Sequence, residues 1–345
     1  MKTITRSRLS QAMTWLFLTT SFILLAIFNA TKPRIVIVHS LSQASSWTSS
    51  VDQGIKAALK DNRAPVSVTS EYLNLDLLSV NADLEALASG MRRRIDAIDP
   101  DVLIVVDDET SELIGRHYVG RSKTSVIYTS LLADPGAYGY RDPSKVIGVR
   151  EILPLSAITE VISHVHPGRS ARIAVVGAAT QTGLAEMQQV RAHDWGPHQM
   201  IASQSVPHFE AWMDFVNGPA RQADVLIALT MDNLAISATQ PRSAPEEQIA
   251  RWTETKAKPL TIGVRASYVQ YGGSLAVSAP PVEYGRSAVE LALKRVANPN
   301  FTPNGSSITL DSYDMSLRLS AIERRGMTLP AIYREAARAS GHLYR

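Results

Sequence analysis

Two kinds of hydrophobic pattern alternate along this chain. Short runs rich in β-branched residues are typical of buried parallel strands. They lie at 34–39, 66–73, 100–106 and 125–128. Between them, apolar residues recur every three or four positions, as they do on the buried side of a helix. These helices are expected at 51–60, 80–98 and 111–118. The β-α-β-α-β-α-β order predicts a parallel sheet with right-handed crossovers.

The pattern starts again after residue 154 and predicts a second unit of similar size. Its strands are expected at 172–176, 200–206, 223–229 and 259–264, and its helices at 155–164, 183–193, 209–217 and 245–255. The later pieces, at 275–278, 284–297, 307–310 and 320–338, most simply complete the two existing sheets. The sequence therefore predicts an α/β fold of two Rossmann-like, doubly wound parallel-sheet lobes.

The lobe boundaries follow from the place where the pattern restarts. We expect lobe 1 to hold residues 34–149 plus about 277–300, and lobe 2 to hold 150–276 plus about 305–345. The chain then crosses between the lobes more than once, and 148–151 is one predicted crossing strand. Such a multi-strand hinge predicts that the lobes close by rotation rather than by local refolding of a loop.

The first thirty residues predict a membrane-targeting segment. Three basic residues open it, namely Lys2, Arg6 and Arg8, and an apolar run follows at 12–28. This layout is typical of an export signal or of a single membrane anchor. Cleavage after Ala30 would place the bulky Phe28 where a small residue is expected, so both alternatives stay open. In either case the body is expected in the periplasm, free or held to the inner membrane.

Composition narrows the possible functions. The 345-residue chain carries 35 basic and 32 acidic residues, and the three basic residues near its start account for the whole excess. The body is therefore neutral overall, which argues against a nucleic-acid partner. The lack of cysteine excludes disulfides, thiolate metal sites and cysteine nucleophiles. No GxGxxG, P-loop or Ser/His/Asp arrangement is present, so we predict no cofactor, no metal site and no catalytic residue.

In open parallel sheets, ligands bind outside the carboxyl ends of the strands. The adjacent acids Asp107 and Asp108 follow the strand predicted at 100–106. In one interpretation a carboxylate faces the cleft and receives a donor from a ligand; in the other, the two acids only cap the next helix. If Asp108 binds the ligand, replacing it with Ala should weaken binding by roughly 2–4 kcal/mol.

Other strand ends supply further candidates. Trp47 lies in a Ser-rich loop and would either stack on a ligand or pack as a satellite core residue. Thr180 and Thr182 belong to a loop that opens a helix, where they would bind an anion or serve as a plain N-cap. Three more candidates follow later strands: Ser130, Asp232 and Arg265. Together these groups suit a small ligand with a donor end and an acceptor end, such as a zwitterion or a neutral polar solute.

Several stretches resemble type I periplasmic binding proteins. More narrowly, they resemble the ABC-transporter substrate-binding family that includes aromatic-amino-acid binders and the periplasmic domains of some sensor kinases. The similar stretches are SSWTSSVDQGIKAAL, DPDVLIVVDDETSELI, SVIYTSLLADP, TQTG and GGSLAVSAPPVEYGRSAVELALKRV, within about residues 34–330. The resemblance implies two lobes joined by three strands that close on a small ligand. The cleft residues it implies are Trp47, Asp108, Ser130, Thr182, Asp232 and Arg265.

The resemblance also implies a function. We expect an extracytoplasmic solute-binding protein that serves an ABC importer, with an ABC permease as its partner. The alternative is the ligand-sensing component of a signalling system, whose partner is a membrane sensor protein such as a kinase or cyclase. Both are binding functions, and we do not expect an enzyme. The loop AATQTG departs from the more acidic, Asn-containing loop of the amino-acid binders, so the sequence does not name the ligand.

Overall fold

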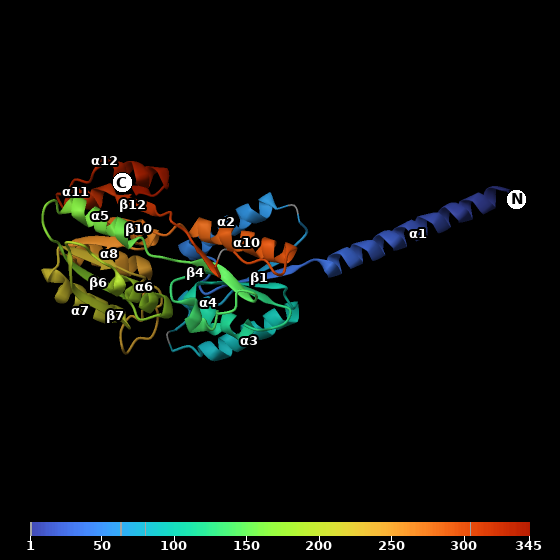
Figure 1. Cartoon of the computed structure of the whole chain (residues 1–345), viewed down its shortest axis with the longest axis horizontal. Coiled ribbons are helices and arrows are strands. Elements are labelled where there is room, and N and C mark those ends of the chain that lie inside the picture. The colour runs from blue at the N-terminus through green and yellow to red at the C-terminus, as the bar shows by residue number, and fades with distance from the viewer. Residues whose placement is uncertain (1, 63, 80, 304) are drawn as a thin grey trace.

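A computed structural model describes residues 2–62, 64–79, 81–303 and 305–345. The chain forms a two-lobed body and one long N-terminal helix, α1 (Lys2–Thr31), which points away from it (Figure 1). Within α1, residues 10–29 have a mean hydropathy of 1.7 and no buried part. Twenty helical residues extend about 30 Å, the thickness of a bilayer's hydrocarbon core. Only Lys32 and Pro33 separate α1 from the first strand.

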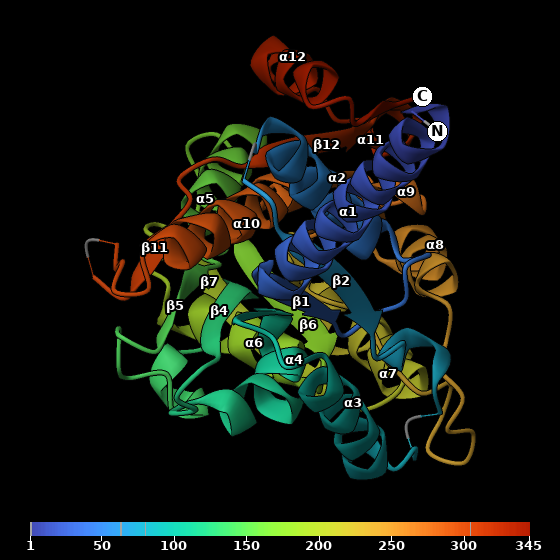
Figure 2. The same cartoon turned by 90° about the vertical axis from the view of Figure 1, so that its right-hand side faces the viewer.

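The first lobe contains a six-stranded parallel sheet in the order β11-β5-β4-β3-β1-β2. Its strands are β1 (Arg34–His39), β2 (Ser67–Tyr72), β3 (Val102–Val106), β4 (Ser125–Leu131), β5 (Val146–Arg150) and β11 (Ser307–Thr309). Helices α2 (Ser46–Asp61) and α10 (Pro281–Ala297) cover one face. The other face carries α3 (Leu84–Ile98), α4 (Asp107–Leu113) and three short 3-10 turns: η1 (Leu75–Leu77), η2 (Gly115–Tyr118) and η3 (Pro135–Tyr138). Figure 2 shows these two layers on opposite sides of the sheet.

The second lobe contains a seven-stranded sheet in the order β13-β12-β10-β9-β8-β6-β7, in which only the β10–β12 pair is antiparallel. Its strands are β6 (Arg172–Ala178), β7 (Gln199–Val206), β8 (Val225–Ala228), β9 (Leu260–Gly263), β10 (Leu275–Ser278), β12 (Asp314–Arg318) and β13 (Leu343–Tyr344). One face packs against α5 (Leu155–Val165), α6 (Gln181–Ala192), α11 (Leu319–Arg324) and α12 (Ala331–Ala339). The other packs against α7 (Phe209–Asn217), η4 (Pro219–Gln222), α8 (Glu246–Lys256) and α9 (Ala266–Gln270). The predicted fold class is confirmed.

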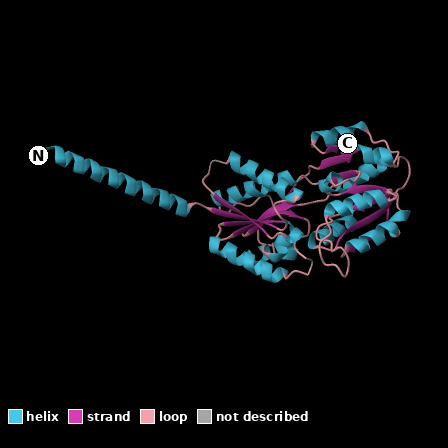
Figure 3. Cartoon of the chain, turned by 180° about the vertical axis from the view of Figure 1, so that it is seen from behind, coloured by secondary structure: helices cyan, strands magenta, loops and turns pink. Residues whose placement is uncertain are grey.

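Within the described residues the chain passes between the lobes after β5, after β10 and after β11. Figure 3 shows the two lobes side by side, each with strands between helices. The strand expected to cross at 148–151 is β5, which stays in the first sheet as far as Arg150 before the chain crosses. The segment expected in the second lobe at 305–345 begins in the first sheet instead, because β11 pairs in parallel with β5. Residue 80, where a helix was expected to start, lies outside the described residues; α3 begins at Leu84.

Two glycines bring α10 against α2 at backbone distance. A Cβ atom on Gly54 would lie 1.8 Å from the carbonyl oxygen of Val282, and one on Gly285 would lie 2.1 Å from that of Val51. Only glycine at these two positions therefore permits α2 and α10 to approach so closely. The contact matters for the cleft because α2 begins one residue before Trp47, and α10 begins directly after the second crossing.

Candidate ligand-binding cleft

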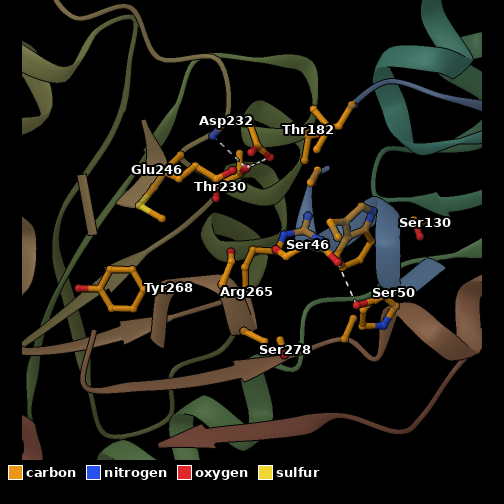
Figure 4. Close-up of a pocket in the computed structure, with 18 of the residues that line it drawn as sticks. Ser46, Ser50, Ser130, Thr182, Thr230, Asp232, Glu246, Arg265, Tyr268 and Ser278 are labelled. Atoms are coloured by element: carbon orange, nitrogen blue, oxygen red, sulfur yellow. Dashed lines mark hydrogen bonds between the residues drawn. The ribbon is translucent and has the colours of Figure 1, made fainter. Parts of the chain in front are cut away.

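A cavity of about 110 Å³ lies between the lobes, at the carboxyl ends of the parallel strands. The first lobe contributes residues that follow β1, β3 and β4, and the second contributes residues that follow β8 and β9 and the starts of α6 and α8. The polar lining includes Ser40, Ser46, Ser50, Asp107, Glu109, Ser130, Glu151, Thr182, Thr230, Asp232, Glu246, Arg265 and Ser278. Figure 4 shows Arg265 near the middle of this arrangement. Six of the eight candidate residues line the cavity.

Arg265 is held in place from two sides. Its Nη2 atom lies 2.7 Å from Glu186 Oε1, and its Nη1 atom lies 3.1 Å from Glu151 Oε1. Its guanidinium carbon lies 4.4 Å from the centre of the Trp47 ring, a cation–π contact that joins the two lobes. Burial raises the pKa of Glu151 to about 7, and the positive charge of Arg265 opposes that shift. Burial also raises the pKa of Glu186, again against Arg265.

Glu109 connects the two lobes at the start of α6. Its carboxylate accepts hydrogen bonds from the backbone N–H of Thr182, at 3.0 Å, and from the Thr182 hydroxyl. Burial raises the pKa of Glu109 to about 7, although both Thr182 bonds lower it. The loop expected to receive an anion therefore receives a carboxylate of the chain itself. Thr180 does not line the cavity; its hydroxyl accepts from the Gly183 N–H at 3.1 Å, which is the N-cap alternative.

The two adjacent aspartates face different ways. Asp107 lines the cavity and has a left-handed φ of 83°. Its carboxylate accepts from the Ser40 hydroxyl and, at 3.0 Å, from the Thr110 N–H, so it also caps α4. Asp108 is fully buried and does not line the cavity. It accepts from the backbone N–H groups of Leu132 and Ala133 and from the Tyr138 hydroxyl, so it fastens the loop after β4.

Asp232 and Glu246 form the acidic wall of the second lobe. The Thr230 hydroxyl donates to Asp232 at 2.8 Å, as Figure 4 shows. Burial, together with the charge of Asp232, raises the pKa of Glu246 well above its usual range. Opposite this wall, Ser130 has a left-handed φ of 55° and a buried hydroxyl without a partner among the described residues. Strained backbone at Asp107 and Ser130 is typical of binding sites.

Sequence reasoning missed four carboxylates at this site: Glu109, Glu151, Glu186 and Glu246. Two of them could have been predicted from their positions in the sequence. Glu109 directly follows the acidic pair that was singled out, and Glu151 directly follows β5, at a strand end. The other two lie on helices, where an acidic residue is ordinarily solvent-exposed. Nothing in the local pattern indicates that Glu186 is fully buried.

Comparison with known proteins adds structural matches only. No protein-family model matches the chain, and no curated protein matches it. A conserved domain protein from Vibrio cholerae is 15% identical with a TM-score of 0.66, over 91% of this chain and 100% of that one. The ABC domain from Streptococcus pneumoniae, solved with L-Trp, is 12% identical with a TM-score of 0.66, over 89% and 99%. An ABC transporter solute-binding protein from Clostridium phytofermentans with bound L-rhamnose is 12% identical with a TM-score of 0.56, over 90% and 99%.

These matches cover nearly the whole chain, at identities that establish fold and nothing finer. The chain has the two-lobe fold of the type I periplasmic binding proteins, the fold of ABC-transporter solute-binding proteins. The family resemblance that was read from the sequence motifs is confirmed at this level. The cavity between the lobes lies where that fold brings its strand ends together.

Proposed function

We propose that this chain is an extracytoplasmic solute-binding protein of an ABC-type importer, and that it encloses a small polar solute between its lobes. The observation that carries the proposal is the polar cavity between two lobes that are joined by three crossings of the chain. Proteins of the same fold have been solved with L-Trp and with L-rhamnose. The role is binding rather than catalysis, and the ABC permease is the partner.

We propose that this arrangement of the lobes is the closed form. Glu109 and Thr182 bond across the lobes, and Arg265 stacks on Trp47 across them. A further interlobe contact joins the Ser79 hydroxyl to the Pro241 carbonyl at 3.3 Å. A cavity of about 110 Å³ is somewhat smaller than an engineered cavity of ~150 Å³ that holds benzene. The solute that this cavity encloses is therefore small.

The N-terminal helix supports an exported location. Its exposed apolar residues, such as Trp15 and Phe22, have no protein partner in the described structure and are suited to a signal segment or to lipid. We propose that α1 is retained and anchors the body to the inner membrane on its periplasmic side. Because two residues span at most about 7 Å, the first lobe would then stay close to the membrane surface.

That short connection favours a second candidate function. A body that cannot diffuse away from the membrane suits a fixed membrane partner, such as a sensor kinase or cyclase that reads the state of the lobes. Deletion of the gene distinguishes the two functions. Loss of uptake of the bound solute supports the importer, whereas intact uptake with loss of a transcriptional response supports the sensor.

The binding function itself is tested on the purified protein. Heat-released small molecules are identified by mass spectrometry, and each is then titrated back onto stripped protein by calorimetry. A solute that rebinds, raises the melting temperature and reduces the radius of gyration supports the proposal. If no solute co-purifies and no solute in a broad panel changes melting or scattering, the proposed function is wrong.

A further inference from the structure

We infer that the group recognised in this cleft is a cation, such as a protonated amine, and not the carboxylate of a zwitterion. This inference deepens the proposed function and rests on it. It comes from three observations. The first is the charge of the residues that line the cavity. The second is that Arg265 and the N-terminus of α6, which could receive an anion, already bond to carboxylates of the chain, and the third is the set of buried polar atoms without partners.

The charged side chains that line the cavity are mostly acidic. Among the described residues, the lining carries five carboxylates against one guanidinium, that of Arg265. His342 is the lining's remaining basic side chain. Carboxylates come from both lobes, with Asp107 and Glu109 in the first and Asp232 and Glu246 in the second. Glu151 pairs with Arg265, and the other four carboxylates form no ion pair among the described residues. Enclosing an ionised carboxylate without a counter-charge costs several kcal/mol unless it takes up a proton, and a bound cation would relieve that cost without protonation.

Arg265 and the N-terminus of α6 could each receive an anion, and each already bonds to carboxylates of the chain. The guanidinium of Arg265 donates from Nε and Nη2 to Glu186 and from Nη1 to Glu151. Its face lies over Trp47. The N-terminus of α6 receives the carboxylate of Glu109 through Thr182. Three of the five guanidinium N–H groups of Arg265 are used in this way. A ligand carboxylate would reach only the remaining two, next to further carboxylates.

Buried polar atoms in the cavity wall that have no partner can accept a hydrogen bond from a ligand, although its hydroxyls can also donate one. The hydroxyls of Ser130 and Ser278 are 1% and 2% exposed and line the cavity, and they have no partner among the described residues. The same holds for Oε2 of Glu151, at 1% exposure. A carboxylate oxygen accepts and cannot donate when ionised, and a hydroxyl can accept. An ammonium group, with three donors and no acceptor, satisfies this set of acceptors.

The experiment uses three solutes of matched size and the full chain in detergent. They are 1,4-diaminobutane, its uncharged isostere 1,4-butanediol, and ornithine, which adds a carboxylate to the diamine. Calorimetric titration at pH 7.5 should give the diamine an affinity at least roughly tenfold above either partner, the scale of one charge-assisted hydrogen bond. L-Tryptophan and L-rhamnose are titrated alongside, and the charge of any co-purified solute is determined by mass spectrometry.

Matched variants locate the interaction. Glu246→Gln and Asp232→Asn remove charge from the cleft wall and should each weaken diamine binding at least about tenfold. Glu247→Gln is the control, because Glu247 is the next residue on α8, is half-exposed and pairs with Arg251. It should leave the affinity unchanged. Melting curves establish that each variant is folded.

The outcomes separate this inference from the proposed function. Preferred binding of the diamine, or a co-purified cation, together with loss in the two cleft variants supports the inference. Binding of the diol, rhamnose, tryptophan or ornithine in preference to the diamine overturns the inference and leaves solute binding intact. Folded cleft variants that bind the diamine as well as the parent also overturn it. If no solute binds and none co-purifies, both the inference and the proposed function fail.

Discussion

Replacing Arg265 with Met tests what holds the cleft wall of the second lobe together. Arg265 is 15% exposed and pairs with Glu151 and Glu186, which are 1% and 0% exposed. Methionine keeps an unbranched apolar stem beside Trp47 but leaves both carboxylates buried without their counter-charge. Removing one partner of a buried ion pair ordinarily costs about 3–5 kcal/mol, because the remaining charge cannot be solvated.

The loss of stability in the Arg265→Met variant should grow as the pH rises. Without the guanidinium, the folded protein raises the pKa of Glu151 further above about 7, the value that burial gives it beside Arg265. A carboxyl whose pKa is higher in the folded than in the unfolded state binds its proton more tightly when folded. Stability then falls as the pH increases above the unfolded pKa. The variant should therefore be closest to the parent near pH 5 and farthest from it near pH 8.

Differential scanning calorimetry measures this effect. In a lobe of about 150 residues, 1 kcal/mol shifts the melting temperature by ~2–4 °C, so a loss of about 3–5 kcal/mol predicts a decrease of ~6–20 °C at pH 8. The double variant Arg265→Met with Glu186→Gln should recover part of it, because one unpaired charge is gone. Arg251→Met is the control, since its pair with Glu247 is exposed on both sides. A decrease no larger than that of the control, or one independent of pH, would refute the reasoning.

Three further outcomes are expected. Burial raises the pKa of Glu109 to about 7 where it bonds Thr182 in the closed form, so ligand-free protein should scatter as a more compact particle at pH 5 than at pH 8. Glu109→Gln should reduce that difference, and a variant that keeps all of it contradicts the assignment. Asp108→Ala should lower the melting temperature by about 4–8 °C for roughly 2 kcal/mol of unsatisfied buried donors. Its affinity for the co-purified solute should change little, and tenfold weaker binding with unchanged melting would return Asp108 to the site. Sequencing of the native protein from membranes should begin at Met1, whereas a start near Thr31 would show that α1 is removed.

The sheets were predictable because their signal is local. The run at 34–39 has a wholly apolar centre at 35–38, since a parallel strand covered on both faces excludes polar residues there, and β1 has the predicted bounds. The strand β11 was placed in the wrong lobe for the opposite reason. It has three residues, all with partly or fully exposed side chains, and only its pairing with β5 assigns it to the first sheet. That pairing joins segments about 160 positions apart in the sequence.

The cleft was only partly predictable because its partners are distant in sequence. Strand-end reasoning located Arg265 but could not show that it is already paired, since Glu186 and Glu151 lie 79 and 114 positions away. Among the three acids that open α4, strand-end reasoning selected Asp107 and Asp108 but missed Glu109, which lines the cavity. Asp107 has a left-handed φ of 83°, so the three acids do not follow regular helical directions. Asp107 and Glu109 reach the cavity, while Asp108 bonds to the loop after β4.

If the cleft binds a cation as inferred, charge links closure of the lobes to binding of the solute. When no cation is present, the carboxylates that closure buries favour protonation, as the raised pKa values of Glu109 and Glu151 show. Low pH and a bound cation would then both stabilise the closed form relative to the open form. Each supplies positive charge to the carboxylates that closure buries, whereas in the open form these carboxylates are solvated. The two differ in their pH dependence. A cation competes with protons for the same carboxylates, so its affinity should increase as the pH rises through about 7, the pKa of both Glu109 and Glu151. A neutral solute held by hydroxyls would lack that increase, which makes the pH dependence of the affinity a test of the ligand's charge even before the ligand is known.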